Sequence, residues 1–211
     1  MKRLGFSAII AVLVAGAVAS AAPTYLQDWE SGVAGWASKH GSSDPVVLVT
    51  DPTSPAGSMV HKVTRTDSGG NYFSPIIPLI PGQKYVLGAW INWVSGGTPF
   101  IGVYMRDAAG NIVQPEWLIG QSGYPTGDGT TVTPVDPNAQ GWTWYQKSFI
   151  ANPDVVTTQI RTELFGAGKG GNPLAFFDGI QITQVPVPSS LLLCGIGLSM
   201  VRRVVRRKRR A

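Results

Sequence analysis

Aromatic, amide and charged side chains alternate with apolar ones in several short segments of this chain. Successive side chains of a β-strand point to opposite faces, so this alternation collects the polar set on one side of a strand. Taken together, these positions are Trp90, Asn92, Tyr104, Arg106, Gln146, Arg161 and Glu163. The apolar CH face of a pyranose ring stacks on Trp or Tyr, and its hydroxyl groups need donors and acceptors in fixed positions. The set therefore predicts a sugar-binding face.

Two alternatives remain open for these residue types. The outer face of any sheet must carry polar groups, and Arg161 with Glu163 would then be a surface ion pair that contributes less than about 1 kcal/mol. Alternatively, Trp117, Tyr124 and Trp144 lie in or near predicted loops. These three aromatic residues would place a site at the loop tips instead.

Catalytic chemistry has little support in the sequence. The chain has two histidines, His40 and His61, and lacks the H-x-x-x-H, G-x-S-x-G and P-loop patterns. Glycoside hydrolysis needs two carboxylates across a cleft, and nothing singles out a pair among Asp107, Glu116 and Glu163. We expect that the protein is not an enzyme.

Glycine and proline divide the chain into short segments that suit strands. Between residues 22 and 184, no stretch free of both exceeds twelve residues, which leaves no room for long helices. Short β-branched and aromatic runs between turn signals are typical of a β-sandwich or barrel. The predicted strands are residues 58–65, 72–79, 83–94, 100–106, 142–150, 155–164 and 175–183. Residues 120–141 are rich in Gly, Pro, Thr and Asp, which predicts a long surface loop.

The apolar positions of three predicted strands also indicate which residues form the core. Along each strand these apolar residues alternate with the polar set, so they lie on the opposite face. The expected core residues are Tyr85, Leu87, Ala89, Ile91, Trp93, Ile101, Val103, Met105, Ile160 and Leu164.

The segments come in a recognisable order over about residues 26–183. The sequence DWESG at 28–32 and Trp36 precede residues 57–63 and the sequence IPGQKYVLGAW; GWTWY and AFFDGI come later. This order resembles the CenC-type carbohydrate-binding modules of families 4, 9 and 22. The resemblance implies an all-β jelly-roll β-sandwich that binds glycans on a concave face or at loop tips. It also implies a structural Ca²⁺, because Glu30 and Asp178 match the acids that hold calcium in these modules, with carbonyl oxygens as further ligands.

Both ends of the chain carry export features. Residues 1–21 combine Lys2 and Arg3, an apolar stretch and Ala19-Ser20-Ala21, which predicts a signal peptide cleaved before Ala22. Nine of the 17 Lys and Arg residues lie in the two terminal segments, whereas all 12 Asp and Glu residues lie between them. The net charge of +5 therefore comes from the ends, and we expect no nucleic-acid partner.

Residues 185–211 combine a proline motif, a short apolar run and a basic tail. The motif is Pro186, Val187, Pro188, Ser189 and Ser190; the run at 191–201 contains the single cysteine, Cys194. As a helix this run would span roughly 16 Å, against a bilayer core of about 30 Å. This order resembles the PEP-CTERM sorting signal of exopolysaccharide-producing Gram-negative bacteria, with Val187 in place of the usual glutamate. The resemblance implies a transient inner-membrane anchor that an exosortase cleaves.

The sequence thus predicts three parts: a signal peptide at 1–21, a jelly-roll domain at 22–184, and a sorting signal with a short transmembrane helix at 185–211. The expected function is non-catalytic binding of carbohydrate, either exopolysaccharide or another glycan, at the cell surface or outside the cell. The expected partners during export are signal peptidase, an exosortase and the inner membrane. The alternatives are a structural matrix or adhesion protein that binds protein partners and, third, a hydrolase.

Overall fold

The computed structural model describes residues 23–38, 45–64, 71–123 and 131–186. These residues form ten strands whose pairings are antiparallel, except that β7 and β8 pair in parallel. The short strands are β1 (Tyr25–Gln27), β2 (Ala37–Ser38), β3 (Val47–Thr50), β4 (Met59–Val63), β5 (Tyr72–Phe73) and β8 (Thr133–Pro134). The longer strands are β6 (Lys84–Arg106), β7 (Ile112–Gly120), β9 (Thr143–Ile150) and β10 (Thr157–Gln184).

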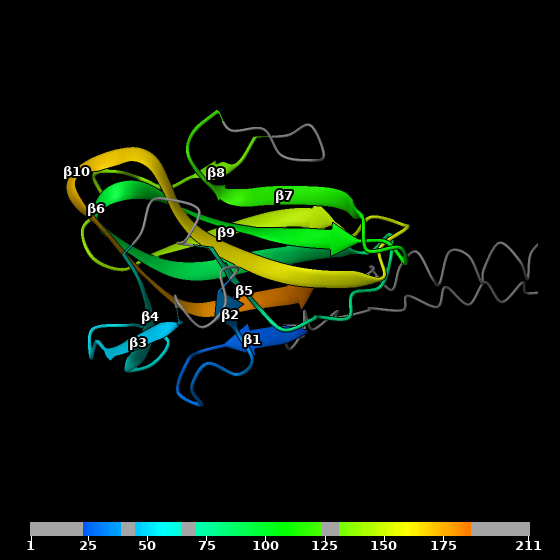
Figure 1. The fold of residues 1–211 in the computed structure, drawn as a ribbon, viewed down its shortest axis with the longest axis horizontal. Coiled ribbons are helices and arrows are strands. Elements are labelled where there is room, and N and C mark those ends of the chain that lie inside the picture. Colours follow the sequence, from blue (N-terminus) through cyan, green and yellow to red (C-terminus); the bar gives the residue numbers. More distant parts are fainter. Residues whose placement is uncertain (1–22, 39–44, 65–70, 124–130, 187–211) are drawn as a thin grey trace, which may run out of the picture.

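Two long strands, β6 and β10, turn back at one end of the molecule and so run through two layers (Figure 1). In the first layer, residues 84–93 of β6 lie between β9 and the second half of β10, and that half of β10 also pairs with β1 and β4. In the second layer, residues 98–106 of β6 lie between β7 and the first half of β10, which also pairs with β5. The sandwich therefore consists of two halves of the same two strands, extended by shorter strands.

The turn between the layers requires glycine in β6. Gly96 has φ of +70°, and a Cβ atom built there would lie 2.3 Å from the Cα atom of Pro173. An L-residue would meet both the backbone of β10 and an unfavourable dihedral angle. The register of β6 against β10 also shifts between Phe165 and Ala175, where the second strand makes the same turn.

The core lies between the two layers and consists of the residues that the alternation predicts. All ten expected core residues are buried, and nine of them are at most 2% exposed, with Trp93 at 7%. The all-β sandwich and its core positions are therefore confirmed.

The structure differs from the prediction in element boundaries. Residues 95–99, expected to separate two strands, continue β6, and the predicted strand at 72–79 shortens to β5 with an isolated bridge from Ile77 to Thr158. β7 was not predicted, because Pro115 stands in its middle. Proline is tolerated there because, among the described strands, β7 pairs only with β6 at that position, so no second ladder needs its missing N–H group.

The predicted terminal segments lie mostly outside the described residues. This applies to residues 1–22 and to the sorting motif after Pro186. Pro186 itself is the last described residue and is exposed. Within the described ranges, no helix has the length and apolar character needed to cross a bilayer.

Candidate functional site

The most developed polar cluster lies on the outer face of the second layer, around Arg161 of β10. Its guanidinium carbon lies 4.7 Å from the ring centroid of Trp117 on β7, 5.1 Å from that of Tyr104 on β6, and 5.7 Å from that of Phe73 on β5. Three neighbouring strands thus place aromatic rings around one arginine. Cation–π contacts of this kind contribute from about 0.5 to 2 kcal/mol each, depending on exposure.

Hydrogen bonds fix the orientation of the same guanidinium group. Its Nε donates to Asn71 Oδ1 at 2.6 Å, its Nη1 donates to Tyr104 Oη, and its Nη2 donates to Glu163 Oε2 at 2.8 Å. The Arg161 and Glu163 side chains are only 14% and 9% exposed. The alternative of a solvent-exposed surface ion pair is therefore wrong, and this pair is a largely buried one.

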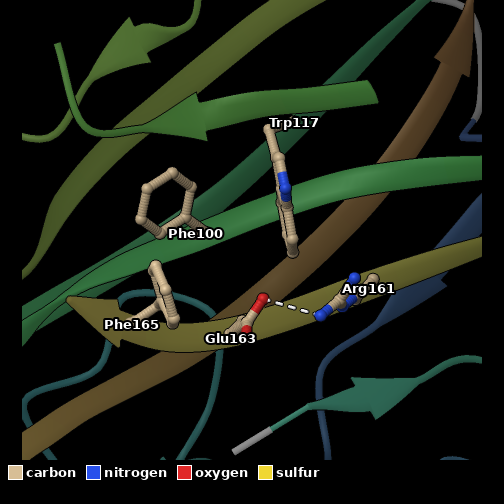
Figure 2. Close-up of a pocket in the computed structure, with 5 residues that line it drawn as sticks. All are labelled: Phe100, Trp117, Arg161, Glu163 and Phe165. Atoms are coloured by element: carbon tan, nitrogen blue, oxygen red, sulfur yellow. Dashed lines mark hydrogen bonds and ion pairs between the residues drawn. The ribbon is translucent and has the colours of Figure 1, made fainter. Parts of the chain in front are cut away.

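A cavity of about 240 Å³ opens beside this cluster, lined by Phe100, Trp117, Arg161, Glu163 and Phe165. Figure 2 shows the Trp117 ring edge-on, with Phe100 and Phe165 on one side of it and Arg161 on the other. The Glu163 carboxylate lies between Phe165 and Arg161 and makes the ion pair with Arg161. Phe165 is 46% exposed, so the cavity has an aromatic rim that faces solvent. We call these five residues and Tyr104 the aromatic–arginine face.

Two glycines allow the aromatic–arginine face to form. Gly102 pairs with Arg161 on one side and Trp117 on the other, so no side chain stands between them on β6. At Gly120, a Cβ atom would lie 2.2 Å from Cδ1 of Phe100. That distance is too short for any side chain there, so the Phe100 ring can pack against the end of β7 only because residue 120 is glycine.

The seven sequence-predicted sugar-binding residues do not share one face. Tyr104, Arg106, Arg161 and Glu163 belong to the second layer, whereas Trp90, Asn92 and Gln146 belong to the first. In both layers the alternate residues of β6 enter one common core, so the polar sides of the two layers point away from each other. The prediction of a single face is corrected, because β6 turns between layers at Gly96.

A second aromatic cluster occupies the outer face of the first layer. The rings of Trp90 and Trp144 have centroids 5.4 Å apart, and Trp144 Nε1 donates to Gln146 Oε1 at 3.2 Å. A Cβ atom at Gly88 would lie 2.3 Å from the Trp144 ring, so this ring covers the glycine. These three side chains do not line the cavity beside Arg161.

The remaining candidates have local structural roles. Arg106 donates from Nη1 to the carbonyl of Gly110, and Asp107 accepts from the backbone of Asn111, both within the turn after β6.

The aromatic residues predicted in or near loops lie in strands where they are described. Trp117 lies in β7 and Trp144 in β9. Tyr124, His40 and the side chain of Glu116 are outside the described part.

His61 is enclosed in the aromatic part of the core. It is 0% exposed and touches the rings of Trp29, Trp36, Tyr72 and Phe177. Neither ring nitrogen has a hydrogen-bond partner among the described residues. Burial lowers the pKa of His61 to about 3, so the imidazole stays neutral and does not resemble an accessible acid or base.

The two predicted calcium ligands meet the same segment of chain, residues 54–59. Glu30 accepts hydrogen bonds from the backbone N–H groups of Met59, at 2.7 Å, and Ser58. Asp178 is completely buried and accepts from the Ser54 hydroxyl and from the Gly179 N–H at 2.7 Å. Residues distant in sequence are thus brought together, although the described residues contain no group of three side chains placed to hold a metal.

The charges around Asp178 fit a hard cation. Burial is the main cause that raises the pKa of Asp178, and the nearby negative charges of Asp28 and Glu30 raise it further. The Met59 N–H group is the main cause that lowers the pKa of Glu30. A calcium ion would use carboxylate and carbonyl oxygens and would offset this negative charge.

Sequence reasoning missed Asn71, Phe73, Phe100 and Phe165. The last two were accessible to it, because Phe100 has the same parity as Tyr104 and Phe165 the same parity as Arg161 and Glu163. Asn71 and Phe73 reach the site through the pairing of β5 with β10, which no local pattern indicates.

No family model matches the chain, and no curated protein matches it. Among solved structures, the CBM22-1 xylan-binding domain of Paenibacillus barcinonensis Xyn10C superposes with a TM-score of 0.53 at 14% identity, over 80% of this chain and 97% of that domain. The CBM22-1–GH10 modules of Clostridium thermocellum xylanase 10B, in complex with xylohexaose, give a TM-score of 0.54 at 14% identity over 78% of this chain and 29% of theirs. The C-terminal family 22 module of Clostridium thermocellum Xyn10B gives 0.51 at 14% identity over 79% of this chain and 96% of that module. At such identities the likeness establishes the fold, a β-sandwich like those of carbohydrate-binding modules.

Proposed function

We propose that this protein binds polysaccharide without catalysis, through the aromatic–arginine face. The observation that carries the proposal is the solvent-rimmed cavity between Trp117, Phe100 and Phe165, with Glu163 between the rings. Aromatic rings supply the apolar surface on which the CH face of a sugar packs. The Glu163 carboxylate and the Tyr104 hydroxyl supply hydrogen-bonding groups for sugar hydroxyls.

The charge of this site suits a neutral sugar. Glu163 compensates the positive charge of Arg161 at 2.8 Å, and Asn71 and Tyr104 accept hydrogen bonds from three more of its five N–H donors. Among the described residues, an anionic group would therefore find no cation at this site without a counter-charge. The volume of about 240 Å³ lies below the range of about 300–1,000 Å³ of drug-sized pockets, as expected for a site that takes one ring of a longer chain.

The structural neighbours suggest the first ligand to test. Several of them are xylan-binding modules, and one is described with xylohexaose. We therefore propose xylohexaose as the first neutral probe and a glycan array as the broader search. Saturable binding that Trp117→Ala weakens would support the proposal. The alternative, a matrix or adhesion protein that binds protein partners, predicts no saturable binding of any glycan.

We also propose the export route that the terminal segments suggest. In this proposal signal peptidase releases the chain before Ala22, and an exosortase removes the tail near Pro188 after transient anchoring in the inner membrane. The mature protein would then bind exopolysaccharide at the surface of a Gram-negative bacterium or outside it. Intact mass spectrometry of released protein tests this: a species that retains Arg202 would contradict the sorting step.

A structural calcium ion is part of the same proposal. Glu30 and Asp178 would supply carboxylate oxygens, and the ion would hold the segment at 54–59 against β10. This binding would stabilise the sandwich and would take no part in any chemical step.

A further inference from the structure

A second and larger cavity, of about 540 Å³, lies at the end of the sandwich where β6 and β10 turn between the layers. Trp93 and Thr98 of β6, Gln121 after β7, Asp136 after β8 and Lys169 of the turning part of β10 contribute to its lining. The cavity borders the aromatic–arginine face, because Thr98 pairs with Phe165 of that face. The two cavities nevertheless share no lining residue.

Lys169 gives this cavity a positive charge that forms no ion pair among the described residues. Its Nζ donates to the carbonyl oxygens of Trp93, at 2.7 Å, and Ala139, at 3.3 Å, and lies 5.1 Å from the ring centroid of Trp93. These partners orient the ammonium group but carry no net charge. Among the described residues no carboxylate lies within ion-pair distance of Lys169, and two carbonyl bonds leave one of its three N–H donors for a ligand.

The other polar groups of the cavity are consistent with a ligand that accepts hydrogen bonds. Trp93 is 7% exposed, and its indole N–H has no partner among the described residues. A buried donor without a partner costs free energy, and a ligand oxygen would recover it only if the Trp93 ring shifted to expose this N–H group. The negative group in the lining, Asp136, is exposed at the rim and accepts from the Asn138 N–H at 2.8 Å.

The apolar part of the lining suits the body of a sugar ring. Pro134, Val135 and Pro137 contribute to it together with Trp93. An apolar wall with a held, unpaired cation fits a ring that carries a carboxylate. This contrasts with the aromatic–arginine face, where Glu163 already compensates Arg161.

We infer that the cavity at Lys169 is a separate binding site for an acidic sugar, a glycosyl unit whose carboxylate meets the Lys169 ammonium group. This inference extends the proposed polysaccharide binding, and it gives the protein two sites of different charge preference at one end of the sandwich. A polysaccharide that contains both neutral and uronate units would engage both cavities.

The test is a calorimetric titration of the full-length chain with tetragalacturonate, with its methyl ester and with xylohexaose. We expect Lys169→Met to weaken tetragalacturonate binding at least tenfold. Lys84→Met, which removes the same charge from the exposed start of β6 at the opposite end of the sandwich, should leave it unchanged. The methyl ester should bind at least tenfold more weakly than the acid. Ser122→Trp, at an exposed position of the lining, should block the site without touching Lys169.

Trp117→Ala separates this inference from the proposed function, because it should weaken xylohexaose and leave tetragalacturonate binding unchanged. If the unsubstituted protein binds tetragalacturonate but not xylohexaose, the proposed function is contradicted and the acidic site still stands. The acidic site is overturned if tetragalacturonate does not bind, if its ester binds equally well, or if Lys169→Met behaves like Lys84→Met.

Discussion

The guanidinium group of Arg161 and the ring of Trp117 lie 4.7 Å apart, across a strand that has glycine between them. Trp117 is thereby fixed on one side by a charged group that is itself held by Asn71, Tyr104 and Glu163. A ring fixed in this way loses little conformational freedom when a ligand packs against its other side. The contact therefore links the packing of three strands to the shape of the proposed sugar site.

Gly102→Val tests whether this spacing matters. A branched side chain at the position between Arg161 and Trp117 should separate them and cost about 1–3 kcal/mol by overpacking. We expect xylohexaose binding to fall at least tenfold. Gly170→Val is the matched control, because a Cβ atom there meets nothing within 4 Å. Equal binding by both variants, measured by titration, would show that the spacing is irrelevant.

Glu163→Gln tests the ion pair. The substitution keeps the shape of the side chain but leaves the largely buried Arg161 without its counter-charge. We expect the free energy of unfolding to fall by about 1–3 kcal/mol, measured by urea denaturation. A double variant, Arg161→Met with Glu163→Leu, should regain part of this stability, because it removes both charges from the low-dielectric site. An unchanged stability in Glu163→Gln would mean that solvent screens the pair.

His61 should make stability depend on pH. Its pKa of about 3 in the folded protein lies below the ordinary value of about 6.5, so between these values the unfolded chain binds a proton that the folded protein does not. Stability from this residue is therefore fully present above pH 6.5 and falls by at most about 1.4 kcal/mol per pH unit below it.

His61→Leu isolates this effect, since every carboxylate is common to both proteins. Urea unfolding between pH 7 and pH 4 should show a steeper loss for the unsubstituted protein than for the variant. Parallel curves would contradict the neutral, fully buried imidazole.

Calcium should raise the melting temperature. A ligand that binds only the folded state adds about 2.7 kcal/mol at one hundred times its dissociation constant. We expect chelator to lower the melting temperature, added Ca²⁺ to restore it, and Asp178→Asn to abolish this response. No response of the unsubstituted protein to chelator would remove the calcium proposal. Asp178 would then act only through its bonds to Ser54 and Gly179.

The alternation of residues predicted the inside of the sandwich well. Tyr85, Leu87 and Ile91 enter the core because a strand with one buried face has only one register that buries its apolar residues. The same rule indicates a face only relative to its own strand. Trp90 and Tyr104 both face away from the core on β6, but they lie on the outer faces of different layers. The rule could not show this, because it depends on the turn at Gly96.

The composition of the site was accessible to sequence reasoning only in part. The alternation predicts Arg161, Glu163 and Tyr104, whereas the sequence places Trp117 only in or near a loop, because Pro115 argues against a strand at β7. Phe73 of β5 and Asn71, which directly precedes β5, reach Arg161 through the pairing of β5 with β10, between residues about 90 positions apart. Such non-local contacts leave no periodic signal in the chain.

The most direct test of the account is titration of Trp117→Ala and of Trp144→Ala with xylohexaose, beside the unsubstituted protein. Both tryptophans are partly exposed on outer faces, but Trp117 lines the cavity with Arg161 and Trp144 lies on the other layer. We predict that Trp117→Ala weakens binding at least tenfold, about 1.4 kcal/mol, while Trp144→Ala binds like the unsubstituted protein. Loss of binding in Trp144→Ala with normal binding in Trp117→Ala would contradict the assignment of the aromatic–arginine face as the sugar-binding site.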